Sequence, residues 1–232
     1  MSILNISNLT FSYDKNKETL RDVSFSIEGK ENLGIIGQNG AGKTTLLLLI
    51  AGIINTNNSI RIFGKSLKKE NINEIRKNIG FIFQDPNDQL FMPTCYEDLA
   101  YGLINKGVEK MEIEKRIDEI LEKLGITHLK YSLSHHLSQG EKKKIALATV
   151  LIMSPKLIII DEPTANLDPR IRRELVKMIN SINCTKIIAS HDLDFISKTT
   201  NKALLLYEGK NKYCGDTKEL LEKEKFLIEY GL

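Results

Sequence analysis

Residues 37–44 read GQNGAGKT and fill every defined position of the phosphate-binding pattern G-x-x-x-x-G-K-[ST]. The residues before them, LGII, are apolar and partly β-branched, which predicts a buried parallel strand over 33–36. Residues 45–50 are apolar and free of helix breakers, which predicts a helix. A glycine-rich turn that fits by chance is the alternative, but strand, glycine loop and helix in this order are the context that the pattern needs.

The chemistry expected of this loop is nucleotide binding. Glycines let backbone N–H groups close around phosphate oxygens, and the start of the following helix adds its dipole. Lys43 is expected to bring a positive charge to the β- and γ-phosphates, and the Thr44 hydroxyl to hold Mg²⁺. The residues predicted to contact the nucleotide are Gly37, Gln38, Asn39, Gly40, Ala41, Gly42, Lys43, Thr44 and Thr45.

The bulk composition limits the classes of protein. The 232 residues, 41% of them hydrophobic, predict one large domain or a core with an inserted lobe. The net charge is +3 without long blocks of one sign, which argues against a nucleic-acid partner. Cys95, Cys184 and Cys214 are far apart, which argues against a disulfide framework or a zinc site and favours a reducing compartment.

No membrane segment is expected. The first residues, MSILNISNLTFSY, alternate in polarity and lack the apolar core of a signal peptide. The longest apolar stretch, residues 46–54, is far shorter than the ~20 residues that span a bilayer. If the protein works at a membrane, we expect a partner to hold it there from the water side.

Two strands are expected near the N-terminus, over residues 3–13 and 23–28, with the charged turn DKNKET between them. Tyr13 ends the first of these strands. Its ring either stacks on an adenine base or is an ordinary tyrosine at a strand end, and the sequence leaves both interpretations open.

Further strands are predicted over residues 59–63 and 79–83, after the turn-rich residues 55–58. Gln84 follows the second of them, at the strand end where ligands bind in open α/β sheets. Its amide either contacts Mg²⁺ or a water, or is a polar strand terminus.

From residue 85 to about 153 helical patterns replace the strand rhythm. Thr94 and Glu97 form a capping box that starts a helix through about residue 105. A second amphipathic helix is expected near 110–124, ended by Gly125. This block is interpreted as a helical lobe inserted into the sheet domain.

The segment SQGE at 138–141 is another capping box, opening a helix that runs through residues 145–153. Two interpretations remain open. Ser138 either only satisfies the free N–H groups of the helix start, or takes part with Gly140 in an anion site. Residues 142–144, three lysines, are expected to form a solvated face.

Two carboxylates follow a buried strand in LIIIDE, residues 157–162. Buried charges need partners, and Mg²⁺ is the partner expected for Asp161 in a P-loop NTPase. Glu162 is then placed to take a proton from an attacking water, which contributes roughly 10²–10⁴ in rate. These two side chains are the strongest candidates for metal binding and catalysis.

The C-terminal third returns to strands. Asp168 and Pro169 begin a helix, and residues 186–190 form a strand followed by His191, for which a γ-phosphate contact is favoured over a plain surface role. An edge hairpin and a last helix finish the chain, over residues 202–207, 212–214 and 216–230.

Taken together, these segments resemble the ATP-binding-cassette (ABC) ATPases over essentially the whole chain. Each is weak alone, but the order is specific: GQNGAGKT, Gln84, LSQGE at 137–141, LIIIDE, ANLD at 165–168 and Ser190-His191. The resemblance implies an α/β P-loop NTPase core with a mainly parallel sheet, an N-terminal antiparallel β subdomain and an inserted helical subdomain. It implies a single ABC ATPase domain over residues 1–232, with its core at 1–84 and 154–232 and its helical subdomain at 85–153.

The resemblance also implies ATP as the nucleotide and a head-to-tail dimer that clamps it between the glycine loop of one subunit and LSQGE of the other. It implies that Tyr13 stacks on adenine and that Ser138 and Gly140 contact the opposite γ-phosphate. It also implies that Asp168 lies at the dimer seam. Gln84 and His191 are implied to contact the attacking water, Mg²⁺ and the γ-phosphate. Gln139 and Glu141 depart from the usual LSGGQ, and a carboxylate near a phosphate is expected to weaken ATP-driven closure.

Residues 83–91, FQDPNDQLF, resemble more closely the energy-coupling-factor (ECF) and cobalt–nickel importer ATPases. The resemblance implies a homodimer or heterodimer that grips a transmembrane T-type coupling protein, with a separate membrane subunit that binds a vitamin or metal ion. Asp85 or Asp88 is hypothesised to pair with arginines of the membrane partner. Some ECF ATPases continue past residues 226–232, so the dimer is expected to be weak without that partner.

The predicted function is therefore ATP hydrolysis coupled to transport, at the cytoplasmic face of the cell membrane. A soluble ABC ATPase of nucleic-acid repair or translation is the alternative, although the tandem cassettes, coiled-coil arms and zinc inserts of that group are not seen. A P-loop kinase or GTPase is disfavoured, since no N-K-x-D motif occurs. The sequence does not identify the transported substrate, because another subunit is expected to bind it.

Overall fold

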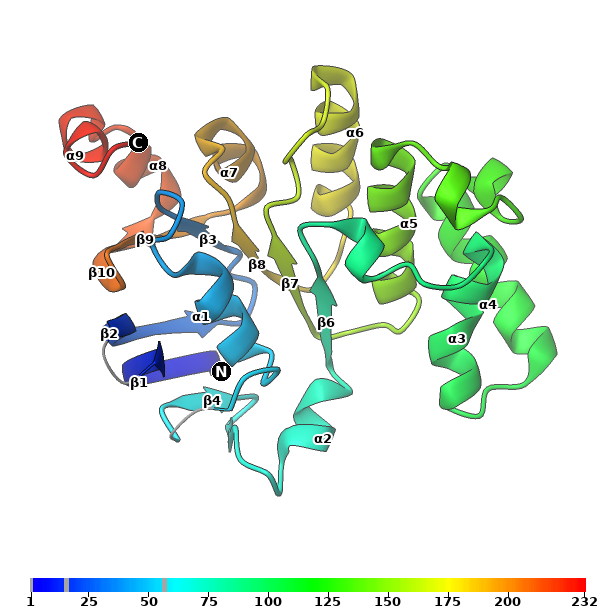
Figure 1. Ribbon diagram of the computed structural model, residues 1–232, viewed down its shortest axis with the longest axis horizontal. Coiled ribbons are helices and arrows are strands. Elements are labelled where there is room, and N and C mark those ends of the chain that lie inside the picture. Colours follow the sequence, from blue (N-terminus) through cyan, green and yellow to red (C-terminus); the bar gives the residue numbers. More distant parts are fainter. Residues whose placement is uncertain (1, 15–16, 56–57) are drawn as a thin grey trace.

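The computed structural model describes residues 2–14, 17–55 and 58–232, and its larger sheet organises the rest (Figure 1). The sheet has the strand order β10-β9-β3-β8-β7-β6, in which only β10 runs antiparallel to its neighbour. Its strands are β3 (Leu33–Ile36), β6 (Ile79–Ile82), β7 (Leu157–Asp161), β8 (Thr185–Ala189), β9 (Lys202–Tyr207) and β10 (Lys210–Asp216).

A smaller antiparallel sheet has the order β2-β1-β4-β5. Its strands are β1 (Ser2–Asp14), β2 (Lys17–Glu28), β4 (Ile60–Ile62) and β5 (Lys65–Ser66). The mainly parallel core sheet and the antiparallel N-terminal sheet confirm the predicted fold class.

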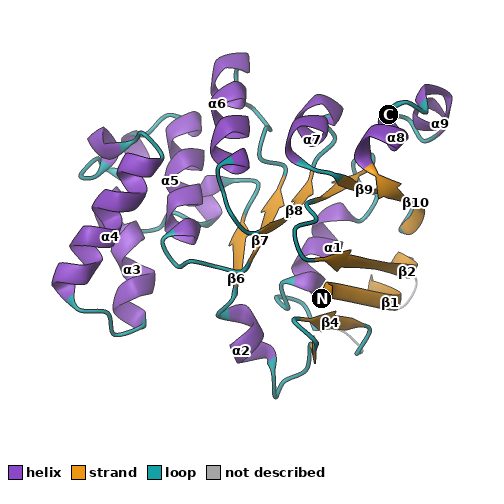
Figure 2. Ribbon diagram, turned by 180° about the vertical axis from the view of Figure 1, so that it is seen from behind, coloured by secondary structure: helices purple, strands orange, loops and turns teal. Residues whose placement is uncertain are grey.

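The helices pack against the larger sheet or beyond its β6 edge, where α3, α4 and α5 gather (Figure 2). The α-helices are α1 (Lys43–Ile50), α2 (Ile72–Arg76), α3 (Cys95–Asn105), α4 (Lys110–Lys123), α5 (Gln139–Leu151), α6 (Pro169–Asn180), α7 (Leu193–Thr199), α8 (Thr217–Leu221) and α9 (Glu224–Glu229). Short 3-10 turns are η1 (Pro86–Asp88), η2 (Thr127–Leu129) and η3 (Ser134–His136). No helix in the described ranges is long and apolar enough to cross a bilayer.

Both faces of the larger sheet are covered, which explains why its strands read as unbroken apolar runs. Side chains alternate between the faces along each strand. In β7, Ile158 and Ile160 join a hydrophobic cluster with α5, α6 and α7, whereas Leu157 and Ile159 join a second cluster with α1 and the smaller sheet.

The first cluster also contains the buried residues of α3 and α4, so the helices beyond β6 share a core with the sheet. The division into a core (1–84 and 154–232) and a helical subdomain (85–153) therefore stays a prediction.

The helix caps that the sequence predicted are present in the structure. Thr94 and Ser138 each accept a hydrogen bond from the N3 backbone N–H, with the reciprocal glutamate bond present in both. Gly125 follows α4 in a left-handed conformation, at φ +67°.

Two predicted elements differ from the structure. Strand β2 begins at residue 17, inside the expected charged turn, because it continues to pair with β1 as far as Asp14. The prediction of a single last helix was wrong, because the structure divides it into α8 and α9 at Glu222 and Lys223. The Lys223 backbone leaves the helical region there, at ψ 59°. Residues 15–16 of that turn and 56–57 of the expected turn-rich stretch lie outside the described residues.

The arrangement places the candidate residues along one edge. The strands β3, β8, β7 and β6 are parallel neighbours in that order. The glycine loop, Ser190 with His191, Asp161 with Glu162, and Gln84 follow their carboxyl ends in turn. Ligands of open α/β sheets bind at this edge.

Candidate nucleotide-binding site

The glycine loop leads directly from β3 into α1. Gly42 is the N-cap of α1 with φ +101°, a conformation that favours glycine. Lys43 is only 6% exposed, and its Nζ folds back to donate to the carbonyl oxygens of Gly37 at 2.7 Å and Gln38 at 3.2 Å. The loop thus holds a cation over a ring of backbone groups, with the helix N-terminus behind it.

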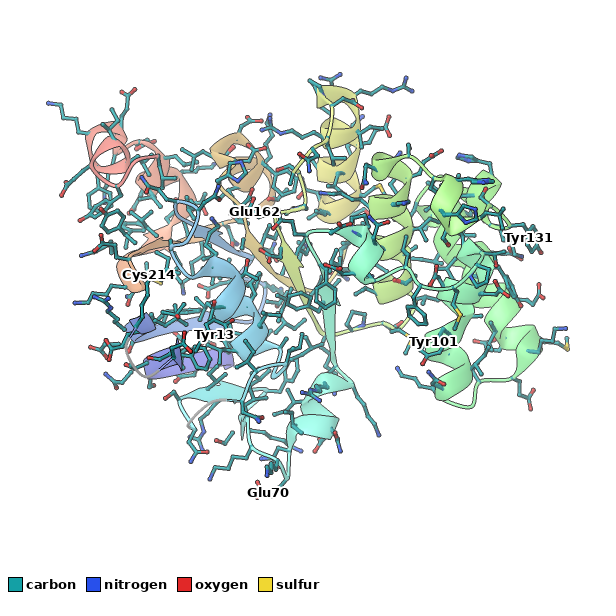
Figure 3. The ribbon with its side chains drawn as sticks, in the orientation of Figure 1. Tyr13, Glu70, Tyr101, Tyr131, Glu162 and Cys214 are labelled. Carbon is teal, nitrogen blue, oxygen red and sulfur yellow. The ribbon has the colours of Figure 1, made fainter. Side chains whose placement is uncertain are left out.

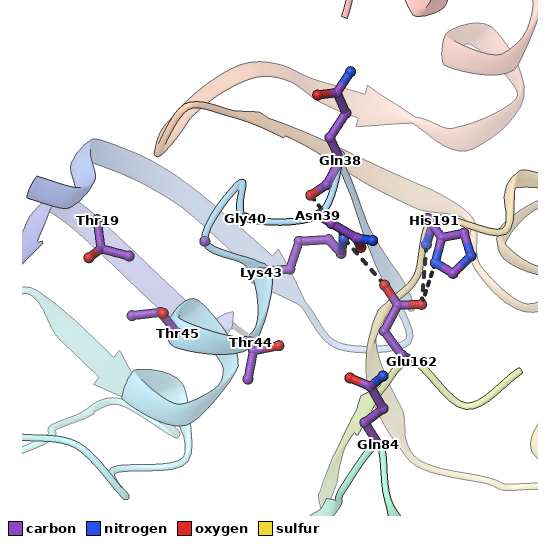
Figure 4. Close-up of a pocket in the computed structure, with 11 residues that line it drawn as sticks. Thr19, Gln38, Asn39, Gly40, Lys43, Thr44, Thr45, Gln84, Glu162 and His191 are labelled. Atoms are coloured by element: carbon purple, nitrogen blue, oxygen red, sulfur yellow. Dashed lines mark hydrogen bonds and ion pairs between the residues drawn. The ribbon is translucent and has the colours of Figure 1, made fainter. Parts of the chain in front are cut away.

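A pocket of about 330 Å³ opens above this loop (Figure 4). The residues that line it are Thr19, Gln38, Asn39, Gly40, Gly42, Lys43, Thr44, Thr45, Gln84, Glu162 and His191. All of these except Thr19 were predicted from the sequence. Thr19 lay within the charged turn between β1 and β2, and no sequence signal marked it. Of the other loop residues, Ala41 is buried and Gly37 holds Lys43 through its carbonyl.

Glu162 lines the pocket immediately after β7. It is 6% exposed and has an unusual backbone φ of +41°. Its Oε2 lies 2.9 Å from His191 Nδ1 and 3.3 Å from the Ser190 hydroxyl, which donates to it. Its Oε1 faces Lys43 Nζ at 3.3 Å but makes no hydrogen bond among the described residues. One carboxylate oxygen is therefore anchored by hydrogen bonds, whereas the other is buried and pairs with the Lys43 ammonium without a hydrogen bond among the described residues.

Asp161 lies beside it at the end of β7, 3% exposed. The pKa of its carboxyl is raised, mainly by burial. The hydrogen bond with the Thr44 hydroxyl and the charge of Lys43 lower that pKa, whereas the nearby charge of Glu162 raises it further. Its Oδ1 has no hydrogen-bond partner among the described residues. A buried, unpartnered carboxylate oxygen beside a threonine hydroxyl fits Mg²⁺, which binds one or two carboxylates together with substrate phosphates.

Gln84 lines the same pocket from the end of β6, on the far side of Glu162 from the glycine loop (Figure 4). The residue is exposed. The four strand ends thus bring together Lys43, Thr44, Asp161, Glu162, Gln84 and His191.

Besides Gly37, Ala41 and Asp161, which adjoin the lining residues in the chain, four predicted residues lie outside this pocket. Tyr13 lines a neighbouring hollow with Thr19 and Gly40, is 59% exposed, and places its hydroxyl 3.3 Å from Thr45 Oγ1. Its exposed ring, packed edge-on against Phe11, is available to a base, and adenine stacking stays a prediction.

Ser138, Gly140 and Asp168 begin the neighbouring helices α5 and α6. The Ser138 hydroxyl donates to Glu141 Oε2 at 2.6 Å. Gly140 is buried against Ile171, so closely that an added Cβ would lie 2.9 Å from the Ile171 side chain. Asp168 caps α6 by accepting from two backbone N–H groups, at 2.8 and 3.0 Å. Each has a structural role within this chain, and their contacts with a second subunit stay predictions.

The three lysines after this motif are not one solvated face, so that prediction was wrong. Lys142 donates to Asn87 at 2.8 Å, and Lys144 pairs with Glu174 at 2.5 Å. Lys143 is only 8% exposed and turns inward. Its neighbours in the helix, Gly140 and Leu147, are buried on the same stripe, and packing of that stripe carries the lysine into the interior.

The buried lysine in a glycine loop, the pair of carboxylates after the central strand and the unpartnered oxygens between them define a P-loop nucleoside-triphosphate site. A protein-family model described as "ABC transporter" matches residues 20–165. The chain belongs to this family of ATP-binding ABC ATPases, as the order of its motifs predicted.

Individual relatives agree with the finer resemblance. The chain is 41% identical over 231 residues to the energy-coupling factor transporter ATP-binding protein EcfA of Carboxydothermus hydrogenoformans, covering 98% of this chain and 85% of that protein. It is 38% identical over 226 residues to the protein of the same name from Methanocaldococcus jannaschii, covering 95% and 81%. The solved structure of CbiO1 from Clostridium perfringens, described as part of the ABC transporter complex CbiONQ, matches with a TM-score of 0.86 at 35% identity, covering 98% of this chain and 94% of that one.

Proposed function

We propose that this chain is the ATP-hydrolysing subunit of an energy-coupling-factor importer for a vitamin or for cobalt or nickel ions. The names of its EcfA relatives and the CbiONQ complex of its structural neighbour support that group. The observation that carries hydrolysis is the carboxylate of Glu162, held at Oε2 by His191 and paired at Oε1 with Lys43 alone among the described residues. Nothing in the comparisons favours the nucleic-acid alternative.

In this proposal Lys43 turns from Glu162 to the γ-phosphate when ATP binds, because a phosphate is the more highly charged partner. Glu162 Oε1 is then free to accept a proton from the attacking water. His191, which lies on the other side of the carboxylate, orients Glu162 and contacts the γ-phosphate, and Gln84 positions the water. General-base assistance of this kind contributes roughly 10²–10⁴ in rate.

Thr44, Asp161 and Gln84 are proposed to hold Mg²⁺. The Thr44 hydroxyl and the unpartnered Asp161 Oδ1 provide the hard oxygen donors that this ion prefers. When bound, Mg²⁺ neutralises negative charge on the phosphates during transfer.

The nucleotide is proposed to be shared by two copies of the chain, or by this chain and a related ATPase. Ser138 and Gly140 start a helix whose N–H groups and dipole suit an anion. They lie outside the pocket of their own subunit, as residues that serve the partner's nucleotide must. Asp168, at the start of α6, is proposed to line the seam between the subunits, and Tyr13 to stack on adenine.

A surface beyond the pocket is proposed to bind the membrane T-type coupling protein at the cytoplasmic face of the membrane. Phe91 and Tyr101 pack edge to face with centroids 5.0 Å apart, and with Ile104 they expose apolar side chains, at 64%, 43% and 60%. Figure 3 places Tyr101 on the helical side of the molecule, well away from Tyr13. Asp85 and Asp88 are both exposed and suit a basic partner, although the Asp85 carboxylate also caps η1.

Glu162→Gln tests the proposal. The amide keeps the shape of the side chain but accepts protons poorly, so turnover is expected to fall by roughly 10²–10⁴. Because hydrolysis no longer reopens the dimer, gel filtration with MgATP is expected to show a dimer that the wild type does not accumulate. Glu119→Gln, an exposed change of the same chemistry on α4, is the control and should behave as wild type. Normal turnover in Glu162→Gln would refute the assignment of the base.

A further inference from the structure

Lys143 is a buried cation outside the nucleotide pocket. It belongs to the helix that begins at Ser138, yet its Nζ donates to the carbonyl oxygens of Pro163 at 2.8 Å, Ala165 at 2.9 Å and Glu162 at 3.4 Å. An ammonium group has three protons to donate, so these acceptors use its whole capacity. The side chain thus joins α5 to the turn that follows β7.

This turn holds an unfavourable backbone conformation. Glu162 and Asn166 have φ values of +41° and +60°, in the left-handed region that non-glycine residues seldom adopt. Such residues persist only where the surroundings fix them, and they gather at functional sites. Within the turn the backbone supplies a bond from Ala165 N–H to the Glu162 carbonyl, at 3.2 Å. Lys143 binds that same carbonyl and two more beyond it.

The lysine also lies where three segments meet. A cavity of about 300 Å³ is lined by residues of the Gln84 segment, of the start of α5 and of the turn itself. The residues that line this cavity together with Lys143 include Gln84, Asp85, Gln139, Ala165 and Asn166. Lys143 is therefore placed to convey a movement of α5 to the backbone of Glu162.

We infer that Lys143 is a positioning residue for hydrolysis, which links the Ser138 end of α5 to the carboxylate of Glu162 in the same subunit. The inference rests on the proposed function, in which Ser138 and Gly140 meet the partner's ATP and Glu162 acts as base. One subunit's contact with the partner's nucleotide then fixes the geometry of its own catalytic turn. Coupling between two sites requires an element with two arrangements that both sites bias, and α5 joined to the catalytic turn by Lys143 can serve as that element.

Lys143→Met is the direct test, because methionine has nearly the same length and no proton to donate. Misplacement of a reacting group by about 1 Å can cost 10²-fold in rate, so we expect kcat to fall between about 10-fold and 100-fold. The KM for ATP should change less than about twofold, because the groups that hold the phosphates are untouched. Cooperativity in the dependence of turnover on ATP should also decrease.

Lys186→Met is the matched control. Lys186 is 4% exposed, lies in β8 and donates to the main-chain carbonyls of Ile182 at 2.9 Å and Cys184 at 3.4 Å. It therefore shares the burial and bonding of Lys143 but not its contact with the turn. We expect both variants to lose stability in urea unfolding and only Lys143→Met to lose kcat. An equal kcat in the two variants at matched folded fraction would overturn the inference.

A double-mutant cycle separates this inference from the proposed function. If Lys143 acts through Glu162, Lys143→Met should change the residual turnover of Glu162→Gln less than about twofold, because residues that act as a unit are non-additive. Additive losses would overturn the inference while leaving Glu162 as base. If Glu162→Gln alone turned over normally, the proposed function would fail first. Should Lys143→Met not fold, Lys143→Gln, which retains an amide donor, takes its place in the cycle with an intermediate loss expected.

Discussion

Replacing Glu141 by glutamine is predicted to strengthen ATP-driven dimer closure. Glu141 Oε2 accepts the Ser138 hydroxyl proton at 2.6 Å and the Ser138 backbone N–H at 2.9 Å, and these two bonds lower the pKa of the carboxyl. A hydroxyl has one proton, so Ser138 cannot donate it to Glu141 and to a phosphate oxygen together. The serine must leave the carboxylate before it can clamp the partner's ATP.

The size of the effect follows from the difference between two hydrogen bonds. A bond to a charged acceptor contributes about 1.5–3 kcal/mol and a neutral one about 1 kcal/mol, so an amide in place of the carboxylate lowers the cost of releasing Ser138 by about 1 kcal/mol. A symmetric dimer has two such contacts, which makes the gain about 2 kcal/mol, or roughly 30-fold in the dissociation constant. The cap itself should survive, because glutamine also serves in capping boxes.

The assay measures the dissociation constant of the MgATP-dependent dimer by sedimentation equilibrium. It uses a Glu162→Gln background, so that hydrolysis does not reopen the dimer. Glu97→Gln is a closely matched control, since Glu97 accepts from Thr94 Oγ1 at 2.7 Å and from Thr94 N–H at 2.9 Å in an equivalent box on α3. It should alter stability as Glu141→Gln does and leave dimerisation unchanged. A dimer dissociation constant for Glu141→Gln that equals or exceeds that of its parent would refute the reasoning.

Two further predictions concern stability. Burial lowers the pKa of Lys143 from 10.5 to about 8, so between these values the unfolded chain binds more protons than the folded one. The free energy of unfolding of the wild type, measured against Lys143→Met in urea, should therefore rise with pH over this window, by at most about 1.4 kcal/mol per pH unit; a flat difference would contradict it. Gly80→Ala should cost about 1–3 kcal/mol, because its Cβ would lie 2.2 Å from Val150 Cγ1, and Val150→Ala in the same chain should restore most of the loss; no rescue would place the strain elsewhere.

The parts of the fold that sequence predicted well are those with short-range causes. The apolar run of β7 and the capping boxes at Thr94 and Ser138 each depend on residues within one turn or one strand. The glycine loop is equally local, since Gly42 must be left-handed before Lys43 can begin a helix. Such local signals predict the structure correctly because tertiary packing favours the same local conformations.

The parts that were missed depend on long-range packing. Three consecutive lysines look solvated, but Lys143 lies three residues after Gly140 and four before Leu147, both buried. That spacing was visible in the sequence and marks the buried stripe of a helix. What the sequence did not contain was the position of the acceptors at Pro163 and Ala165, which only the folded chain brings beneath α5. The break between α8 and α9 was missed because no glycine or proline marks it in the sequence.

The buried charges of the pocket are best understood as a site that is incomplete in the chain alone. Lys43, Asp161 and Glu162 are all at least 94% buried, and one cation faces two carboxylates. Burying charged oxygens without hydrogen bonds is costly, so stability alone does not account for Asp161 Oδ1 and Glu162 Oε1 in the interior. Their retention is explained if the ligand supplies what the protein lacks: a cation for Asp161, and a phosphate that draws Lys43 away from Glu162. The same exchange that settles the charges would then release Glu162 as a base, so that the carboxylate becomes reactive only when ATP is in place.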